Sequence, residues 1–162
     1  MPTKSSRVTF HPVTVSEALA AGAEDLVTAH SVEVEPFQEI MGVGIDWASC
    51  LAEERRGGLK ILGAWSQGEL VGYAAFSLQK MTQRSNTLVA FNRGLYMSPE
   101  LRGHGLELIS QAEKFAADCG AKAVMQDTLE QHSTEPKRRA SLGDVLVRKG
   151  YRPYARLFLK VL

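Results

Sequence analysis

The residues with the clearest chemical potential lie in a short glycine-rich turn, Arg102-Gly103-His104-Gly105. Glycine lets a backbone pass close to a ligand and adopt positive φ angles. A helix that opens from such a turn aims its N–H groups and its positive dipole end at the same point. Arg102 adds a positive charge. The pattern is typical of a phosphate-binding turn, although paired glycines also occur in ordinary strand-to-helix connections.

The residues on either side of this turn predict the elements that position it. The run from Thr87 to Met97 is apolar and predicts a strand. After the turn, apolar residues recur at helical spacing from Leu108 to Cys119, and Gly120 is a natural C-terminal stop. The glycine turn is therefore expected to join the end of a strand to the start of a helix.

The remaining patterns predict strands over 7–15, 59–65, 70–78, 123–128 and 151–162, with the second and third joined as a hairpin. Helices are expected from a cap at Ser16 to about His30, over 47–56 after a cap at Asp46, and over 137–149. A break is expected at 32–36 and a helical turn at 37–41. This order predicts a layered α/β (α+β) domain with a mixed, mostly antiparallel sheet flanked by helices.

Composition is that of an ordinary globular protein. The 162 residues, 44% of them hydrophobic and 23% charged, suit a single domain over 1–162. A net charge of +1 argues against a nucleic acid or a membrane surface as partner. Cys50 and Cys119 have neither disulfide nor metal-site spacing, and no segment is typical of a signal peptide or a membrane span. We expect a cytoplasmic protein without a metal, with Trp47 and Trp65 as core anchors.

The stretch from Pro99 to Glu107 resembles the signature of the GNAT superfamily of acyl-CoA-dependent N-acyltransferases. That signature is a strand followed by Arg or Gln, two residues, Gly, one residue, and Gly or Ala. Arg102 and Gly105 match two of its three fixed positions, while Glu107 places a carboxylate where a small residue is expected. The order of elements along nearly the whole chain is also similar to the GNAT fold, and the short chain resembles phage-type members.

The resemblance implies acetyl-CoA as the cofactor. In the GNAT fold the fourth and fifth strands splay apart, and the pantetheine arm of CoA lies in the gap. Its amides would pair with the backbone of Leu95, Tyr96 and Met97. The pyrophosphate would lie on the backbone amides of the turn, with added charge from Arg102. The residues of that turn are Arg102, Gly103, His104, Gly105, Leu106 and Glu107.

Acyl transfer to an amine needs a base for the amine, a polarised thioester carbonyl and a proton for the thiolate. Many GNAT members carry a carboxylate base on the fourth strand, but residues 88–94 hold none. The candidates are His30, whose ordinary pKa is near neutral, Glu33 and Glu35 beside the expected acceptor cleft, and Asp127 at the end of the fifth strand. Each is equally explained as a solvated surface residue.

The usual general acid of the family is a tyrosine on the last helix, shortly before a Gly-aromatic pair. Gly150-Tyr151 matches the pair, but the tyrosine position is Leu146, so water would protonate the thiolate. The resemblance implies an N-acetyltransferase that moves an acetyl group directly from acetyl-CoA to a primary amine of a small molecule or a protein. The alternative is a non-catalytic CoA-binding or protein-interaction module on the same fold. Either is compatible with a homodimer.

Overall fold

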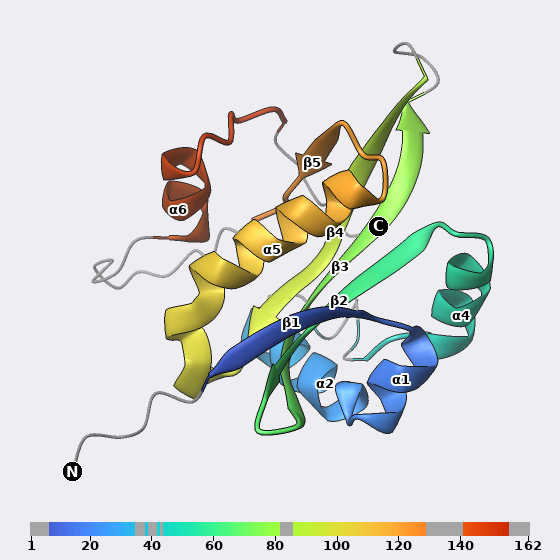
Figure 1. The fold of residues 1–162 in the computed structure, drawn as a ribbon, viewed down its shortest axis with the longest axis vertical. Helices are drawn as coiled ribbons and strands as arrows, with labels where there is room; N and C mark the ends of the chain where they lie inside the picture. Colours follow the sequence, from blue (N-terminus) through green and yellow to red (C-terminus); the bar gives the residue numbers. More distant parts are fainter. Residues whose placement is uncertain are drawn as a thin grey trace. The chain divides into compact units, whose positions relative to one another are not determined.

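The computed structural model describes residues 7–34, 38, 42, 44–81, 86–128 and 141–155. The chain divides into two compact units, Met1–Asp127 and Thr128–Leu162. Within the described residues the larger unit contains a five-stranded sheet in the order β1-β2-β3-β4-β5 (Figure 1). No helix of the described residues has the length and apolar character needed to cross a membrane.

The strands follow the chain from one edge of the sheet to the other. They are β1 (Val8–Val13), β2 (Leu59–Ser66), β3 (Glu69–Met81), β4 (Thr87–Met97) and β5 (Ala123–Met125). Strands β1 to β4 pair antiparallel in sequence, and β5 pairs parallel with β4. Gln67 and Gly68, at φ 53° and 86°, form the two-residue turn of the β2–β3 hairpin. The predicted mixed, mostly antiparallel sheet is confirmed.

Helices cover both faces of this sheet. Before the hairpin come α1 (Val15–Ala20), α2 (Ala23–Val34) and α4 (Trp47–Arg55). The 3₁₀ helix η1 (Pro99–His104) leads from β4 into α5 (Gly105–Asp118), and the smaller unit contains α6 (Leu142–Arg148). Figure 1 shows α5 lying along one face of the sheet, while α2 packs against strand residues of the opposite face.

Local signals account for the helix ends, including two that were predicted wrongly. Thr14, not Ser16, caps α1, because its side chain forms a capping box with Glu17. Gly22 at φ 83° then breaks the single helix expected up to His30, and α2 runs on to Val34, into the expected break. The predicted Asp46 cap of α4 and the Gly120 stop of α5 are confirmed.

The C-terminal predictions are met only in part. β5 ends at Met125 rather than at 128, and residues 151–155 form no strand. α6 begins after a capping box at Ser141. Residues 129–140 and 156–162 lie outside the described residues, as does most of the expected helical turn at 37–41.

One strand carries an irregularity that the sequence pattern did not predict. The register of β4 against β3 shifts by one residue at Arg93. Ala90 and Met97, on either side of this bulge, both pack in the core under α5, although their odd separation would place them on opposite faces of a regular strand. The bulge therefore turns Tyr96 to the other face, where it packs with Tyr73.

The larger core lies between the sheet and α5. Phe76 and Leu108 are each 1% exposed there, and burying a side chain of this size stabilises a fold by about 1.5–3 kcal/mol. The opposite face has a smaller cluster of Val27, Tyr73 and Tyr96, with half-buried Trp47 and Ile61 at its margin. Among the described residues, the cluster of buried apolar side chains on the α5 face is thus the larger of the two.

Candidate active site

The first element of the site is the place where β4 and β5 part. The two strands pair only where Val89–Phe91 lies beside Ala123–Met125. β4 continues to Met97 and stays paired with β3 on its other edge. Within the described residues, 92–97 of β4 therefore have no strand partner on the β5 side. Such an edge offers N–H and C=O groups to an extended ligand that carries amides.

One buried polar atom belongs to the residue that directly follows β5. The Oε1 atom of Gln126, directly after β5, is buried and has no hydrogen-bond partner among the described residues. Buried acceptors are paired in nearly all native structures, so this atom is able to accept a hydrogen bond from a bound group. The position fits the amide-bearing arm that the family resemblance predicts between the two strands.

The second element is the turn after β4, which is helical from its start. Neither Ser98 before η1 nor His104 before α5 makes a side-chain cap hydrogen bond. By contrast, Thr14, Asp46 and Ser141 cap α1, α4 and α6 through their side chains. The positive dipole end of α5 thus lacks the side-chain oxygen that caps these three helices, which is the arrangement of helix N-termini that bind phosphate.

The glycines of this turn do not have the positive φ that was expected. Gly105 has φ −60° and ψ −39°, and Gly103 is absent from the positive-φ glycines. A Cβ atom built on either glycine would meet no atom within 4 Å. Neither backbone strain nor internal packing requires these glycines. Their effect is to leave open space directly over the backbone of the turn.

Charged side chains around the turn are already engaged. Arg102 donates to both carboxylate oxygens of Glu33 on α2, and both side chains are largely exposed. The Nδ1 atom of His104 lies 3.2 Å from Oε2 of Glu107 within the first turn of α5. The guanidinium predicted to meet phosphate is thus paired with a carboxylate, and Glu107 is directed to His104.

The third element is a histidine held between two tyrosines. Nδ1 of His30 lies 2.6 Å from the hydroxyl oxygen of Tyr73, and its ring stacks on Tyr96 with centroids 4.8 Å apart. Partial burial lowers the pKa of His30 below its ordinary value, an effect that the charge of Glu33 partly opposes. The imidazole is therefore neutral near pH 7. Burial also raises the pKa of Tyr73, which stays protonated.

The structure brings only some of the predicted site residues together. His30, Glu33, Tyr96 and Arg102 form one connected group, which joins predicted base candidates to predicted cofactor residues. Asp127 is exposed just past β5 and joins none of these contacts in the described part of the chain. Glu35 lies outside the described residues. The catalytic roles stay predictions.

The remaining predicted cofactor residues turn their side chains elsewhere. Leu95 and Met97 pack in the core under α5, and Leu106 is 56% exposed in the first turn of α5. The predicted contacts of Leu95 and Met97 with CoA therefore depend on the backbone alone.

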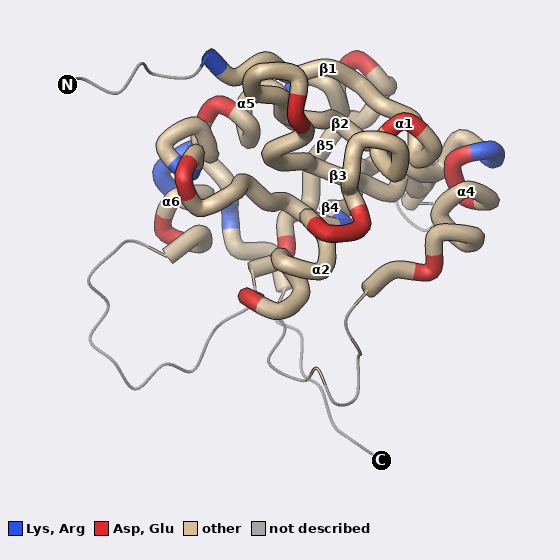
Figure 2. The backbone as a smooth tube through the Cα atoms, turned by 90° about the horizontal axis from the view of Figure 1, so that it is seen from below, with Lys and Arg blue, Asp and Glu red and all other residues tan. Residues whose placement is uncertain are grey.

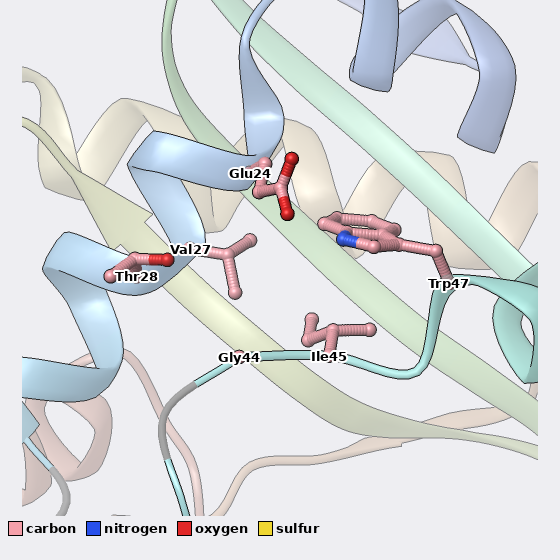
Figure 3. A pocket seen from close by; sticks show the side chains of 6 residues that line it. All are labelled: Glu24, Val27, Thr28, Gly44, Ile45 and Trp47. Carbon is pink, nitrogen blue, oxygen red and sulfur yellow. The ribbon is translucent and has the colours of Figure 1, made fainter.

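Sequence reasoning missed a cavity on the sheet face opposite α5. It has a volume of about 350 Å³, and its lining comes from α1, α2, residues 44–46, α4 and strands β1 to β4, with Tyr73 in the wall. A neighbouring cavity of about 330 Å³ shares Val27, Ile45 and Trp47 with it (Figure 3). Trp47, interpreted as a core anchor, lines both. A lone tyrosine or tryptophan in an apolar pattern gives no sign of such a position.

Comparison with known proteins identifies the family. Residues 25–134 match the model of the acetyltransferase (GNAT) family. No curated protein matches the chain. A solved acetyltransferase of Trypanosoma brucei is 20% identical, with a TM-score of 0.64 over 96% of this chain and 100% of that chain.

Two further solved structures have the same fold. An aminoglycoside acetyltransferase from an uncultured soil metagenomic sample is 14% identical, with a TM-score of 0.68 over 96% of this chain and 98% of that chain. The aminoglycoside N-acetyltransferase AAC(6')-Iy, solved in complex with CoA, is 15% identical, with a TM-score of 0.57 over 100% and 98% of the two chains. The predicted fold is confirmed, and CoA is the cofactor with which this relative was solved. Because the family model spans more than half of the sequence, the chain belongs to the acetyltransferase (GNAT) family.

Proposed function

We propose that this protein transfers an acetyl group from acetyl-CoA directly to a primary amine. The observation that carries the proposal is the meeting of three features at the end of β4. These are its unpaired edge over 92–97, the open glycine turn that follows, and a neutral His30 stacked on Tyr96 of that edge. A cofactor channel and a base therefore adjoin the same strand segment.

The residues present fit acetyl-CoA. The edge of β4 offers backbone groups to the pantetheine amides, and Gln126 offers a buried acceptor where β5 leaves the sheet. Gly103 and Gly105 leave room for phosphate oxygens to approach the backbone at the positive end of α5. Arg102 adds charge there once Glu33 releases it.

We assign the general base to His30. When bound, acetyl-CoA supplies an acyl carbon and a thiolate leaving group. The amine must lose a proton as its nitrogen bonds to that carbon. With hydrogen on Nδ1, donated to Tyr73, the imidazole of His30 keeps a lone pair on Nε2 that accepts this proton. His30 stacks on Tyr96 of the open edge of β4, which favours His30 over Glu33.

The residue at the tyrosine position favours the alternative of a non-catalytic module. Leu146 on α6 is 4% exposed and has no proton to give. Thiols are acidic enough to leave without a strong general acid, so in the enzyme we propose the thiolate takes its proton from water. The two functions share cofactor binding and differ in turnover.

The test is release of free CoA thiol from acetyl-CoA in the presence of a panel of primary amines, with mass spectrometry of the products. We expect amine-dependent thiol release that His30→Gln lowers by about 10²–10⁴-fold, the usual contribution of a general base. His11→Gln, which changes an exposed histidine on β1, is the matched control and leaves the rate unchanged. Saturable acetyl-CoA binding without turnover of any amine would establish the non-catalytic module instead.

A further inference from the structure

We infer that the acceptor is a small monoamine with an apolar, ring-sized body, and that this body binds in the cavity opposite α5. The inference rests on the proposed function, because it names the substrate class of that site. It depends on three observations, which are the walls of the cavity, the charges at its margin, and its position beside His30.

The walls of the cavity are predominantly apolar. They come from α2, the segment before α4, and the sheet, and include Val27, Ile45, Trp47, Ile61 and Ala75. Figure 3 shows Val27 and Ile45 projecting toward one another, with the Trp47 indole beside them. A volume of about 350 Å³ lies at the lower end of the range for small-molecule sites, which is about 300–1,000 Å³. These walls suit a compact aromatic or aliphatic group.

The polar groups of the lining are mostly paired within the protein. Asp46 accepts hydrogen bonds from the N–H and hydroxyl of Ser49, and Glu53 accepts one from the hydroxyl of Ser77. Burial raises the pKa of Cys50, so its thiol stays neutral. Asp46 and Glu53 are thus the carboxylates of the lining, and the hydrogen bonds from the two serines occupy part of their acceptor capacity.

The margin of the cavity favours a cation. α1 and α2 contain Glu17, Glu24, Asp25 and Glu33 and no Lys or Arg, as Figure 2 shows along these helices, but Glu17, Asp25 and Glu33 line neither cavity and Glu33 is paired with Arg102. Glu24 lines the neighbouring cavity, and its carboxylate points toward the Trp47 side. Acidic groups at an opening raise the local concentration of a cationic amine. Arg93, exposed at the β4 bulge and part of the lining, opposes a ligand with several charges.

The cavity also leads to the proposed base. Tyr73 is part of its wall, and the hydroxyl of Tyr73 contacts His30. We place the single amine of the ligand at this Tyr73 wall, next to His30, with its apolar body against Trp47 and Ile45. A polycationic sugar would place its other ammonium groups against walls that are mainly apolar, where Arg93 opposes them and Asp46 and Glu53 are the carboxylates of the lining.

The experiment compares 2-phenylethylamine with kanamycin and glycinamide. Binding is followed first without acetyl-CoA, by the fluorescence of Trp47, with Trp47→Phe to isolate the signal of Trp65. Thiol release from acetyl-CoA then gives kcat/KM for each amine. Ile45→Asn places a neutral polar group in the cavity wall at a residue that is 40% exposed, and Val32→Asn is its matched control on α2 at 56% exposure, outside both cavities.

We expect 2-phenylethylamine to change Trp47 fluorescence, to have the highest kcat/KM of the three amines, and to bind about tenfold more weakly to Ile45→Asn but not to Val32→Asn. A kcat/KM for kanamycin or glycinamide equal to or above that of 2-phenylethylamine would overturn the inference and leave the proposed function intact. Equal binding of 2-phenylethylamine by the two asparagine variants would also overturn the inference. Binding of 2-phenylethylamine that Ile45→Asn weakens, without turnover of any amine, would retain the cavity assignment and reject the proposed function.

Discussion

Replacing Gly105 by alanine should change stability and cofactor binding in opposite directions. Gly105 already has helical φ and ψ of −60° and −39°, and a Cβ there meets no atom within 4 Å. Alanine is favoured over glycine in helices by about 0.5–1 kcal/mol. In a protein of this size that gain raises Tm by about 1–4 °C.

The same methyl group occupies the space in which we place the pyrophosphate. If it displaces a phosphate from one hydrogen bond to the backbone, the loss is about 1.5–3 kcal/mol, because hydrogen bonds to charged groups contribute that much. The Kd for acetyl-CoA should then rise by between about tenfold and a hundredfold. The variant is therefore expected to be more stable than the parent and a weaker binder.

Thermal unfolding followed by circular dichroism, and calorimetric titration with acetyl-CoA, measure the two effects. Ser110→Ala is the matched control, because it exchanges an exposed residue farther along α5 for the same better helix former. The free energy of unfolding of Ser110→Ala should rise by a few tenths of a kcal/mol, and its affinity for acetyl-CoA should equal that of the parent. A Gly105→Ala protein that is more stable and binds with unchanged affinity would refute the assignment of the turn.

Three further changes probe the residues around β4. Glu33→Gln frees Arg102 and should tighten acetyl-CoA binding by up to about fivefold in calorimetry, the range for an exposed ion pair; weaker binding would contradict this. If His30 is the base, kcat/KM should rise with pH and level off with a midpoint below 6.5, because burial lowers its pKa and only neutral imidazole accepts a proton. The same shift means that stability falls as pH decreases from 6.5 through the native pKa, and a midpoint above 6.5 argues against this base. Tyr73→Phe leaves Nδ1 of His30 without its partner. It should lower the free energy of unfolding, measured with denaturant, by about 1–3 kcal/mol and also lower kcat/KM. Unchanged values would show that the contact is dispensable.

Most of the fold could be predicted from local signals in the sequence. The apolar run 87–97 predicted β4 with its observed ends, and the structure confirms the predicted cap of α4 at Asp46 and the predicted end of α5 at Gly120. Each of these depends on residues within one turn or one strand, where propensity and hydrogen-bonding chemistry decide. The wrong cap at Ser16 has the same origin, because Thr14 with Glu17 forms a better local pair than Ser16 does.

The site depends on contacts that local patterns do not contain. The bulge at Arg93 arises from the pairing of β3 with β4, and it decides that Tyr96 faces His30 rather than α5. The pairing of Arg102 with Glu33 joins residues far apart in sequence. The glycine turn was located from sequence, but its helical φ and its open surface required the fold.

Calorimetric titration of acetyl-CoA into the purified protein tests the central claim most directly. The perturbed variant is Gly105→Glu. Its control is Gln111→Glu, which adds the same charge at an exposed position farther along α5. We predict saturable one-to-one binding to the parent and to Gln111→Glu, and loss of binding in Gly105→Glu, because a carboxylate would occupy the phosphate position. Absence of binding by the parent protein, or equal binding by all three, would contradict the assignment of the β4–α5 turn as the acetyl-CoA site.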